Sequence, residues 1–174
     1  MKKLITVIGI LFIIMACTSK KEYYLVKFTL EDSDEMRDVS GYMNSKGDVI
    51  IPAGKYDYCF TDTIRELGIV VEKETGRLLG IDRNANELFE VFRFDNGPDY
   101  EKSGVFRILK NGKIGYANPK GEIVIDPQFE CAYPFEGAFA KVANTCEITT
   151  NGEHSSWNSD NWYRITKDGK RIEN

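Results

Sequence analysis

The sequence predicts an all-β fold built from tandem short antiparallel hairpin repeats, which form an open sheet or a solenoid-like array. Asn111-Gly112 stands between two apolar stretches and is a strong hairpin signal, because both residues tolerate the positive φ of a tight turn. Short apolar runs such as residues 123–125 end close to prolines such as Pro127, which cannot donate to a sheet ladder. A third observation is that one block of sequence recurs along the chain.

The recurring block is clearest in residues 41–52 and 115–127. Both copies begin with Gly-Tyr, pass through an Asn and a Lys-Gly turn, and continue into an acidic residue, an apolar run and a proline. A degenerate middle copy starts near Gly80, and a partial copy lies near Trp162. Each unit has one apolar face that it cannot bury alone, so neighbouring units must stack or pair to form a core.

The remaining segments predict connections around these repeats. Residues 23–30 are rich in aromatic and β-branched residues and predict the first strand. Residues 31–35 predict a solvated acidic turn, because the glycine and the distal glutamate of a calcium loop are absent. Residues 61–67 favour a short helical turn. The polar residues 144–161 predict a long loop that interrupts the last repeat.

Residues 1–16 have the pattern of a targeting segment. Lys2 and Lys3 precede an apolar run that is too short to span a bilayer, which takes about 20 residues. The run ends at Ala16-Cys17 and resembles the lipobox of bacterial lipoproteins. That resemblance implies cleavage before Cys17, lipidation of its thiol and anchoring to a bacterial membrane at the outer membrane or cell surface. We therefore expect a signal peptide (1–16), a lipidated tether (17–22) and a β-repeat domain (23–174).

Charge and cysteine content narrow the classes of partner. The whole chain has a formal net charge of −4, and loss of Lys2 and Lys3 makes the remainder more acidic. Acidic domains repel nucleic acid, so we expect no nucleic-acid partner.

Besides Cys17 the chain has Cys59, Cys131 and Cys146, which permit one disulfide in three possible pairings. With one histidine and no CxxC pair, the sequence predicts no zinc site and no cofactor, and it favours buried free thiols.

The repeat resembles the WG-repeat family, also called KWG repeats. Residues 111–127, Phe129-Glu130 and residues 135–142 carry the best match, while the namesake tryptophan is absent, with Ser40, Leu79 and Ile114 in its place. The resemblance implies a β-rich repeat fold in an exported protein. It brings no established reaction and no catalytic residues, since most members are known only as binding modules.

Candidate functional residues gather near the C-terminus. Trp157, Trp162 and Tyr163 carry aromatic rings suited to sugars or to a protein partner, although Trp162 and Tyr163 fit core positions of the last strand. His154 is the one histidine, and with Cys146 or a neighbouring serine it suggests a hydrolase. Nothing in the sequence specifies the rigid frame that such a site requires.

These observations together favour a non-enzymatic lipoprotein of the cell envelope. We expect it to act as a protein-binding or assembly module with an envelope protein as its partner. The first alternative is a carbohydrate-binding surface lipoprotein that uses Trp157 and neighbouring tyrosines, with a glycan as its ligand. The second is the hydrolase around His154.

Overall fold

The computed structural model describes residues 23–32, 37–151 and 154–172, and its secondary structure there is entirely β-strand. The expected all-β repeat fold is confirmed. Thr63–Ile64 forms a strand, so the helical turn expected over residues 61–67 was wrong. None of the described residues forms a helix long and apolar enough to cross a membrane. The proposed signal peptide and Cys17 lie outside the described residues.

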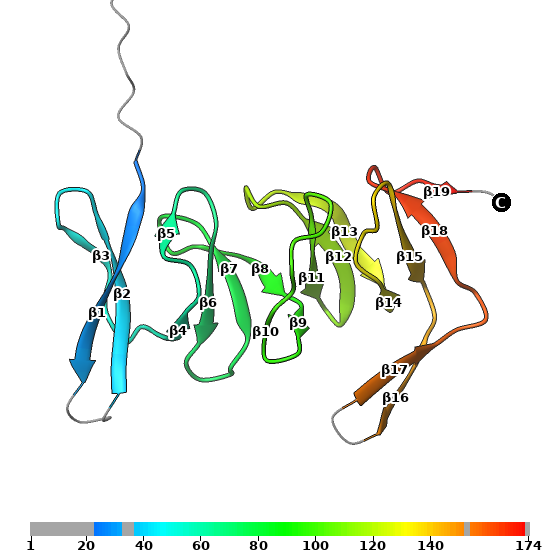
Figure 1. Cartoon of the computed structure of the whole chain (residues 1–174), viewed down its shortest axis with the longest axis horizontal. Helices are drawn as coiled ribbons and strands as arrows, with labels where there is room; N and C mark the ends of the chain where they lie inside the picture. Colours follow the sequence, from blue (N-terminus) through cyan, green and yellow to red (C-terminus); the bar gives the residue numbers. More distant parts are fainter. Residues whose placement is uncertain (1–22, 33–36, 152–153, 173–174) are drawn as a thin grey trace, which may run out of the picture.

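Four antiparallel three-stranded units follow one another along the molecule, from left to right in Figure 1. Repeat 1 consists of β1 (Leu25–Asp32), β2 (Arg37–Asn44) and β3 (Val49–Ile51), and repeat 2 of β6 (Gly68–Glu72), β7 (Leu78–Ile81) and β8 (Glu87–Val91). Repeat 3 consists of β11 (Phe106–Lys110), β12 (Lys113–Ala117) and β13 (Ile123–Phe129), and repeat 4 of β15 (Phe139–Ala143), β18 (Tyr163–Thr166) and β19 (Arg171–Ile172).

Short connector strands join the repeats. They are β4 (Tyr56–Cys59), β5 (Thr63–Ile64), β9 (Arg93–Phe94), β10 (Gly97–Pro98) and β14 (Cys131–Ala132). The connector β4 extends the sheet of repeat 2 by pairing with β6, and β14 extends that of repeat 4 by pairing with β15. Repeats 2 and 3 share one sheet, because β8 pairs with both β7 and β11.

The same turn links the second and third strands in all four repeats. Its first residue is Asn44, Asp82, Asn118 or Thr166, and in each case the backbone N–H of this residue donates to the carbonyl four positions later. The side chain of Asn118 also accepts the N–H groups of Lys120 and Glu122, at 3.0 and 3.1 Å. This shared geometry aligns the four repeats residue by residue, and it places residues 163–172 in the second and third strands of repeat 4.

The middle copy departs from the Gly-Tyr pattern for a packing reason. The turn at Asp82 aligns Gly80 with Tyr42 and Tyr116, whose rings are fully buried. Where those repeats have a tyrosine side chain, repeat 2 has the ring of Phe89, which would lie 2.5 Å from a Cβ atom added at Gly80. Phe89 therefore fills the space of the missing tyrosine.

Three apolar clusters lie between the four repeats, one at each junction. Ile51 of repeat 1 belongs to a cluster with Val70 of repeat 2, Val91 of repeat 2 to one with Ile108 of repeat 3, and Tyr116 of repeat 3 to one with Ile165 of repeat 4. Successive repeats thus pack on one another through these clusters, and repeats 2 and 3 are in addition joined in one sheet. One consequence is that two sheet faces, at the outer sides of repeats 1 and 4, have no neighbouring repeat among the described residues.

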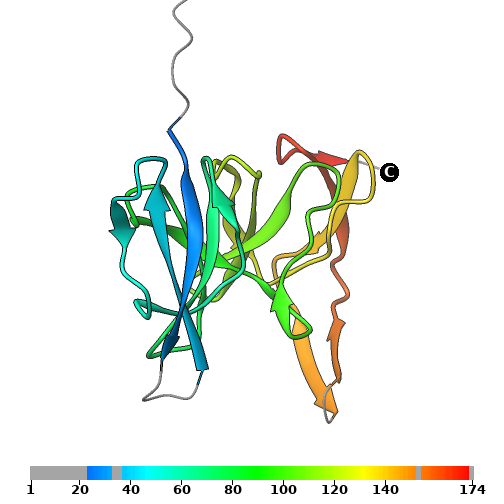
Figure 2. The ribbon, with the colours of Figure 1, turned by 60° about the vertical axis from the view of Figure 1, so that its left-hand side comes forward.

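The segment expected as a long loop contains a hairpin instead. β16 (Glu147–Asn151) and β17 (His154–Asn158) pair along their whole length between the first and second strands of repeat 4. In Figures 1 and 2 this hairpin extends below the body of the array. The prediction of an irregular loop over residues 144–161 was therefore wrong.

Candidate functional site

The outer face of repeat 4 carries aromatic and cationic side chains. In β15, Ala140 and Val142 point into the core, so strand alternation turns Phe139 and Lys141 outward. Arg164 lies opposite Lys141 on β18 and shares this outer face. We call the outward side chains of Tyr133, Phe139, Lys141, Trp162 and Arg164 the terminal face.

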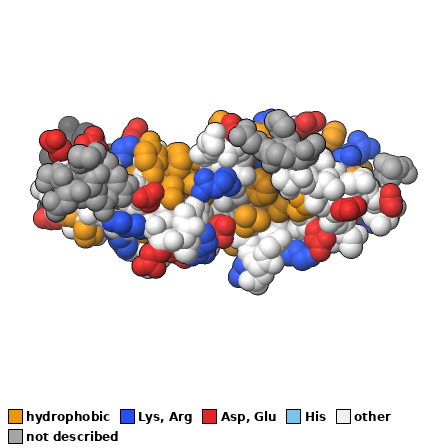
Figure 3. All heavy atoms as spheres, turned by 90° about the horizontal axis from the view of Figure 1, so that it is seen from below, with side chains coloured by type: hydrophobic (Ala, Val, Ile, Leu, Met, Phe, Trp, Pro, Cys, Tyr) orange, Lys and Arg blue, Asp and Glu red, His pale blue; other side chains and the backbone are white. Residues whose placement is uncertain are grey.

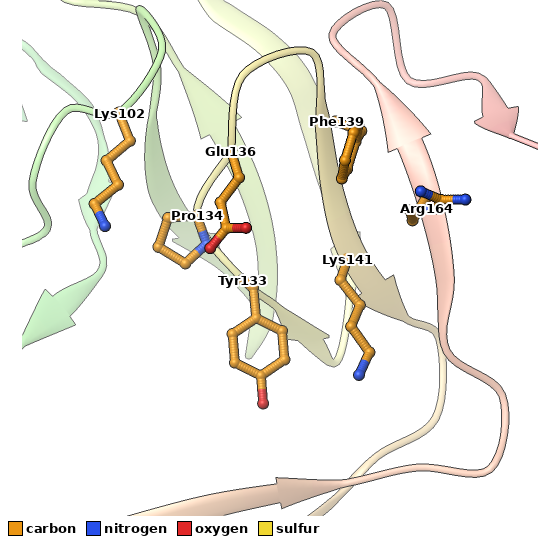
Figure 4. Close-up of a pocket in the computed structure, with 7 residues that line it drawn as sticks. All are labelled: Lys102, Tyr133, Pro134, Glu136, Phe139, Lys141 and Arg164. Atoms are coloured by element: carbon orange, nitrogen blue, oxygen red, sulfur yellow. The ribbon is translucent and has the colours of Figure 1, made fainter.

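The terminal face is hollowed by a pocket of about 360 Å³. Figure 4 shows Tyr133 and Pro134 in its middle, Lys102 on one side, and Phe139 and Arg164 on the other. Tyr133 is 40 % exposed and Phe139 37 % exposed, so solvent reaches both rings. Lys102, Lys141 and Arg164 line the pocket together with Glu136, which gives it an excess of positive charge on an acidic chain.

A second hollow of about 420 Å³ adjoins the first and is lined by Trp162, Tyr163 and polar side chains that include Asn144 and Asn161. The rings of Tyr133 and Trp162 join the two hollows, with centroids 5.3 Å apart. The ammonium group of Lys141 lies 4.7 Å from the centroid of the Trp162 ring, within range of a cation–π contact.

Lys141 occupies a position that has a defined partner in two other repeats. By strand register it corresponds to Lys27 of repeat 1 and Arg107 of repeat 3. Lys27 donates to the carbonyl of Cys59 at 3.3 Å, and Arg107 to that of Ala132 at 3.2 Å. Both carbonyls belong to the connector that leads to the next repeat. Among the described residues no repeat follows repeat 4, and the Lys141 ammonium lies over aromatic rings instead.

Trp157 fixes the inserted hairpin beside the terminal face. Its ring centroid is 5.9 Å from that of Phe92 and 5.5 Å from that of Tyr133. The ring also packs against the core between repeats 3 and 4 and lies beside the guanidinium of Arg107. Trp157 is therefore a structural anchor for the hairpin, and its ring packs against that of Tyr133.

A disulfide joins Cys131 in β14 to Cys146, the residue before β16. The expectation that all three of these cysteines are free was wrong for this pair, because β14 and the end of β15 lie side by side and bring the two thiols together. Cys59 is free and buried as expected, and burial raises the pKa of its thiol. Lys113 and the backbone N–H of Cys146 both donate to Glu130 and lower the pKa of its carboxyl group.

The structure places the other sequence-predicted residues as follows. Tyr163 packs on the core, as expected for the last strand, and its hydroxyl donates to Asn144 at 2.9 Å. Trp162 precedes β18 and belongs to the terminal face. His154 begins β17 and pairs with Asn151, but its side chain lies outside the described part. Cys146 is bonded to Cys131 and cannot serve as a thiolate nucleophile while that bond is intact.

Sequence reasoning missed most of the terminal face and a second exposed aromatic surface. The alternation Phe139-Ala-Lys141-Val was the available signal for an outward Phe139 and Lys141. Elsewhere, Tyr58 and Phe60 form one exposed ring pair at 4.8 Å, and Phe94 and Tyr100 another at 6.0 Å. Figure 3 shows hydrophobic side chains gathered near the middle of the array when it is seen from below.

No cluster of metal-ligating side chains occurs in the described ranges.

The comparisons with known proteins agree with the repeat architecture. No curated protein and no solved structure gave a significant match to the chain. The family model described as WG containing repeat matches residues 41–64 and 114–144. These segments run from β2 to β5 and from β12 to β15, so two stretches of the chain are similar to the WG β-repeat.

Proposed function

We propose that this protein is a non-enzymatic lipoprotein of the cell envelope, held to a membrane by a lipid on Cys17, that binds an envelope protein through the terminal face. Support for the anchor comes from the sequence, in which Lys2, Lys3, an apolar run and Ala16-Cys17 follow in the order of a lipoprotein signal. Support for a binding role comes from the resemblance of two segments to a β-repeat without an established reaction.

The position of Lys141 is the observation that favours a protein partner. At the equivalent position Lys27 and Arg107 each bind a backbone carbonyl of the segment that covers their repeat. A partner chain that lies across the terminal face would offer Lys141 the same kind of acceptor. The surrounding Tyr133, Phe139 and Arg164 are residue types enriched at the centres of protein interfaces.

In-cell photo-cross-linking of the tagged full-length protein tests this proposal. A photoreactive amino acid replaces Phe139, and in a matched control it replaces Val124, which has a similar exposed fraction of 39 % on repeat 3. We expect one reproducible protein adduct from position 139 and none from position 124. Cys17→Ser should remove the adduct by releasing the protein from the membrane, and Lys141→Glu should weaken it without releasing the protein. Equal labelling from both positions, or none from either, contradicts the proposal.

A carbohydrate ligand is the second candidate, and the Tyr133–Trp162 pair favours it. Paired rings at 5.3 Å offer a stacking surface for a sugar, and Asn144, Asp160 and Asn161 supply hydrogen-bonding groups in the adjoining hollow. Glycan-array binding that is lost in Trp162→Ala and kept in Tyr100→Ala would support this candidate. An array without signal from the purified protein would exclude it for the glycans tested.

A further inference from the structure

In repeat 1, two side chains that lie directly opposite each other bind the connector that follows. They are Lys27 of β1 and Tyr42 of β2. The ammonium group of Lys27 donates to the carbonyl of Cys59 at 3.3 Å, and the hydroxyl of Tyr42 donates to the carbonyl of Thr61 at 2.6 Å. The connector therefore crosses this face with two of its backbone carbonyls turned toward the repeat.

Repeat 3 has the same arrangement. Arg107 and Tyr116 are the two opposed residues there. Arg107 donates to the carbonyl of Ala132 at 3.2 Å, and the hydroxyl of Tyr116 donates to the carbonyl of Tyr133 at 2.6 Å. In both repeats, one cation and one hydroxyl thus bind carbonyls that are one or two residues apart in the connector.

Repeat 2 lacks this pair of donors. The equivalent opposed residues are Ile69 and Gly80, whose side chains cannot donate a hydrogen bond. Here β8 itself, and not a connector strand, pairs with the first strand of the next repeat. The donor pair therefore occurs where a connector crosses the face and is absent where none does.

Repeat 4 has the donor pair, although none of its described residues continues into a connector across it. Lys141 and Arg164 are the opposed residues, and both are exposed on the terminal face. Arg164 lies over the ring of Phe139, 5.0 Å from its centroid, and the five N–H donors of a guanidinium allow it to bind a carbonyl as well. The cations of repeats 1 and 3 each also meet a carboxylate, so Glu136 in the terminal pocket is compatible with the same role for Lys141.

The two bound connectors share a small residue followed by an aromatic residue. Cys59 and Ala132 accept the hydrogen bond from the cation and are buried in the core between two repeats. The next residues, Phe60 and Tyr133, are 38 % and 40 % exposed. Their backbone N–H groups point the other way and donate to the first strand of the following repeat. The repeat thus binds one edge of an extended segment and leaves the other edge to a neighbouring sheet.

We propose that the terminal face binds an extended segment of the partner protein in which a small residue precedes an aromatic one. Lys141 donates to the carbonyl of the small residue, and Arg164 donates to a carbonyl one or two positions later. The other edge of the segment pairs within the partner's own sheet, as β4 pairs with β6 and β14 with β15. This inference rests on the proposed function, because it describes how the same face would recognise its protein partner.

Binding of a synthetic peptide to the full-length protein tests the carbonyl contacts. The probe is the peptide of residues 54–62 with Cys59→Ala, which carries both carbonyls that repeat 1 binds. We expect weak, saturable binding by fluorescence anisotropy. Lys141→Met should weaken it at least about tenfold, because the lost hydrogen bond has a charged donor. Lys120→Met is the matched control at an exposed lysine of repeat 3 and should bind like the wild type.

A change in the peptide backbone gives the complementary measurement. An ester in place of the amide between positions 59 and 60 makes the carbonyl a weaker acceptor and leaves every side chain unchanged. It should weaken binding to the wild type and have little further effect on Lys141→Met. Absence of binding at millimolar peptide, or equal binding of the ester and the amide to the wild type, overturns the proposal.

Arg164 allows a matched pair of variants. Arg164→Tyr supplies the hydroxyl that serves at this position in repeats 1 and 3 and should retain most of the binding. Arg164→Phe differs by that hydroxyl alone and should bind the peptide about fivefold more weakly. Because Arg164 is exposed, both variants should keep the circular dichroism of the wild type. Equal binding by the two variants contradicts the role given to Arg164.

Sequencing of the photo-cross-linked adduct separates this inference from the proposed function. We expect the partner residue joined to position 139 to lie in a β-strand that contains the small and aromatic pair. An adduct in a helix, or in a segment without that pair, overturns the inference and leaves the protein-binding role standing. Absence of any adduct contradicts the proposed function, and the peptide titrations then decide the inference by themselves.

Discussion

Arg107 and Asp99 form a bidentate ion pair in the interior of the array. Nη2 of Arg107 lies 2.6 Å from Oδ1 of Asp99, and Nε lies 2.9 Å from Oδ2. The two side chains are only 4 % and 3 % exposed. Arg107 also donates to the carbonyl of Ala132 and stacks 4.1 Å from the centroid of the Phe92 ring. This one pair therefore ties the connector before repeat 3 to the connector before repeat 4.

Removal of one partner of this pair should strongly destabilise the protein. Asp99→Ala leaves the guanidinium of Arg107 buried without a counter-charge, and such changes cost about 3–5 kcal/mol of folding free energy. Urea unfolding of the wild type and the variant at neutral pH measures the difference.

The matched control removes both charges. Asp99→Leu combined with Arg107→Met replaces the pair by apolar groups of similar size and should recover most of the loss. If Asp99→Ala alone lowers the free energy of unfolding by less than about 1 kcal/mol, the pair contributes no more to stability than an exposed ion pair does.

The disulfide between Cys131 and Cys146 should contribute measurably to stability. It closes a loop with a sequence separation of 15, for which chain entropy predicts about 3 kcal/mol. Cys131→Ala with Cys146→Ala should lower the free energy of unfolding by that amount, and a reductant should do the same to the wild type. A reductant that still destabilises the double variant would point to another cause, since the thiol of Cys59 is already reduced.

Local sequence signals predicted the parts of the fold that local physics determines. Asn111-Gly112 forms the expected tight hairpin, and both residues have positive φ. The Asn that begins the Lys-Gly turn holds that turn with its own side chain at Asn44 and at Asn118. These contacts span four residues or fewer, so a short motif is enough to predict them.

The candidate site depends on contacts between distant residues, which a single sequence does not encode in any short pattern. Tyr133 meets Trp157 and Trp162 only because the inserted hairpin folds back beside it and β18 pairs with β15, the neighbour of β14. The hairpin itself was not predicted because its segment is polar, which is typical of a loop. Its Asn151-Gly152 nevertheless has the same turn signal as Asn111-Gly112. Three cysteines allowed three pairings, and only the pairing of β14 with β15 selects Cys131 and Cys146.

Gly115 is required for a close approach of two backbone segments. A Cβ atom at this position would lie 2.5 Å from the carbonyl oxygen of Ile125 and 2.5 Å from the nitrogen of Pro127. Gly115→Ala should therefore lower the free energy of unfolding by about 3 kcal/mol, which is the upper end of the usual range for overpacked cores. Thermal and urea unfolding provide the measurement.

Gly112→Ala is the comparison for this variant. Gly112 has a φ of +72° in the same hairpin but no atom near its Cβ position. Replacing it with alanine should lower the free energy of unfolding by only about 1–2 kcal/mol, because the only penalty here is the left-handed backbone conformation, which alanine disfavours. Equal losses in the two variants would refute the role assigned to the backbone contact at Gly115.

Asp168 should make the last turn sensitive to acid. Hydrogen bonds from Lys170 and Thr166 lower the pKa of its carboxyl group to about 2. Because the folded pKa lies below the ordinary value of 3.8, the ionised form stabilises the turn at higher pH. This contribution should be lost as the pH falls from about 4 to about 2. Carboxyl NMR titration measures the midpoint directly, and a midpoint near 4 would contradict the assignment.

Trp157 should control the attachment of the inserted hairpin. Its half-buried ring contacts Phe92 and Tyr133, and no other side chain of the hairpin packs against a core cluster among those described. Trp157→Ala should lower the free energy of unfolding by about 2 kcal/mol, which is less than the loss usual for a fully buried aromatic residue. Hydrogen exchange should then speed up in β16 and β17 and stay unchanged in repeats 1 and 2. Glu147→Ala, on the opposite face of the hairpin, should change neither the stability nor the exchange. If β16 and β17 keep their protection in Trp157→Ala, the hairpin is held by its own pairing and not by the tryptophan.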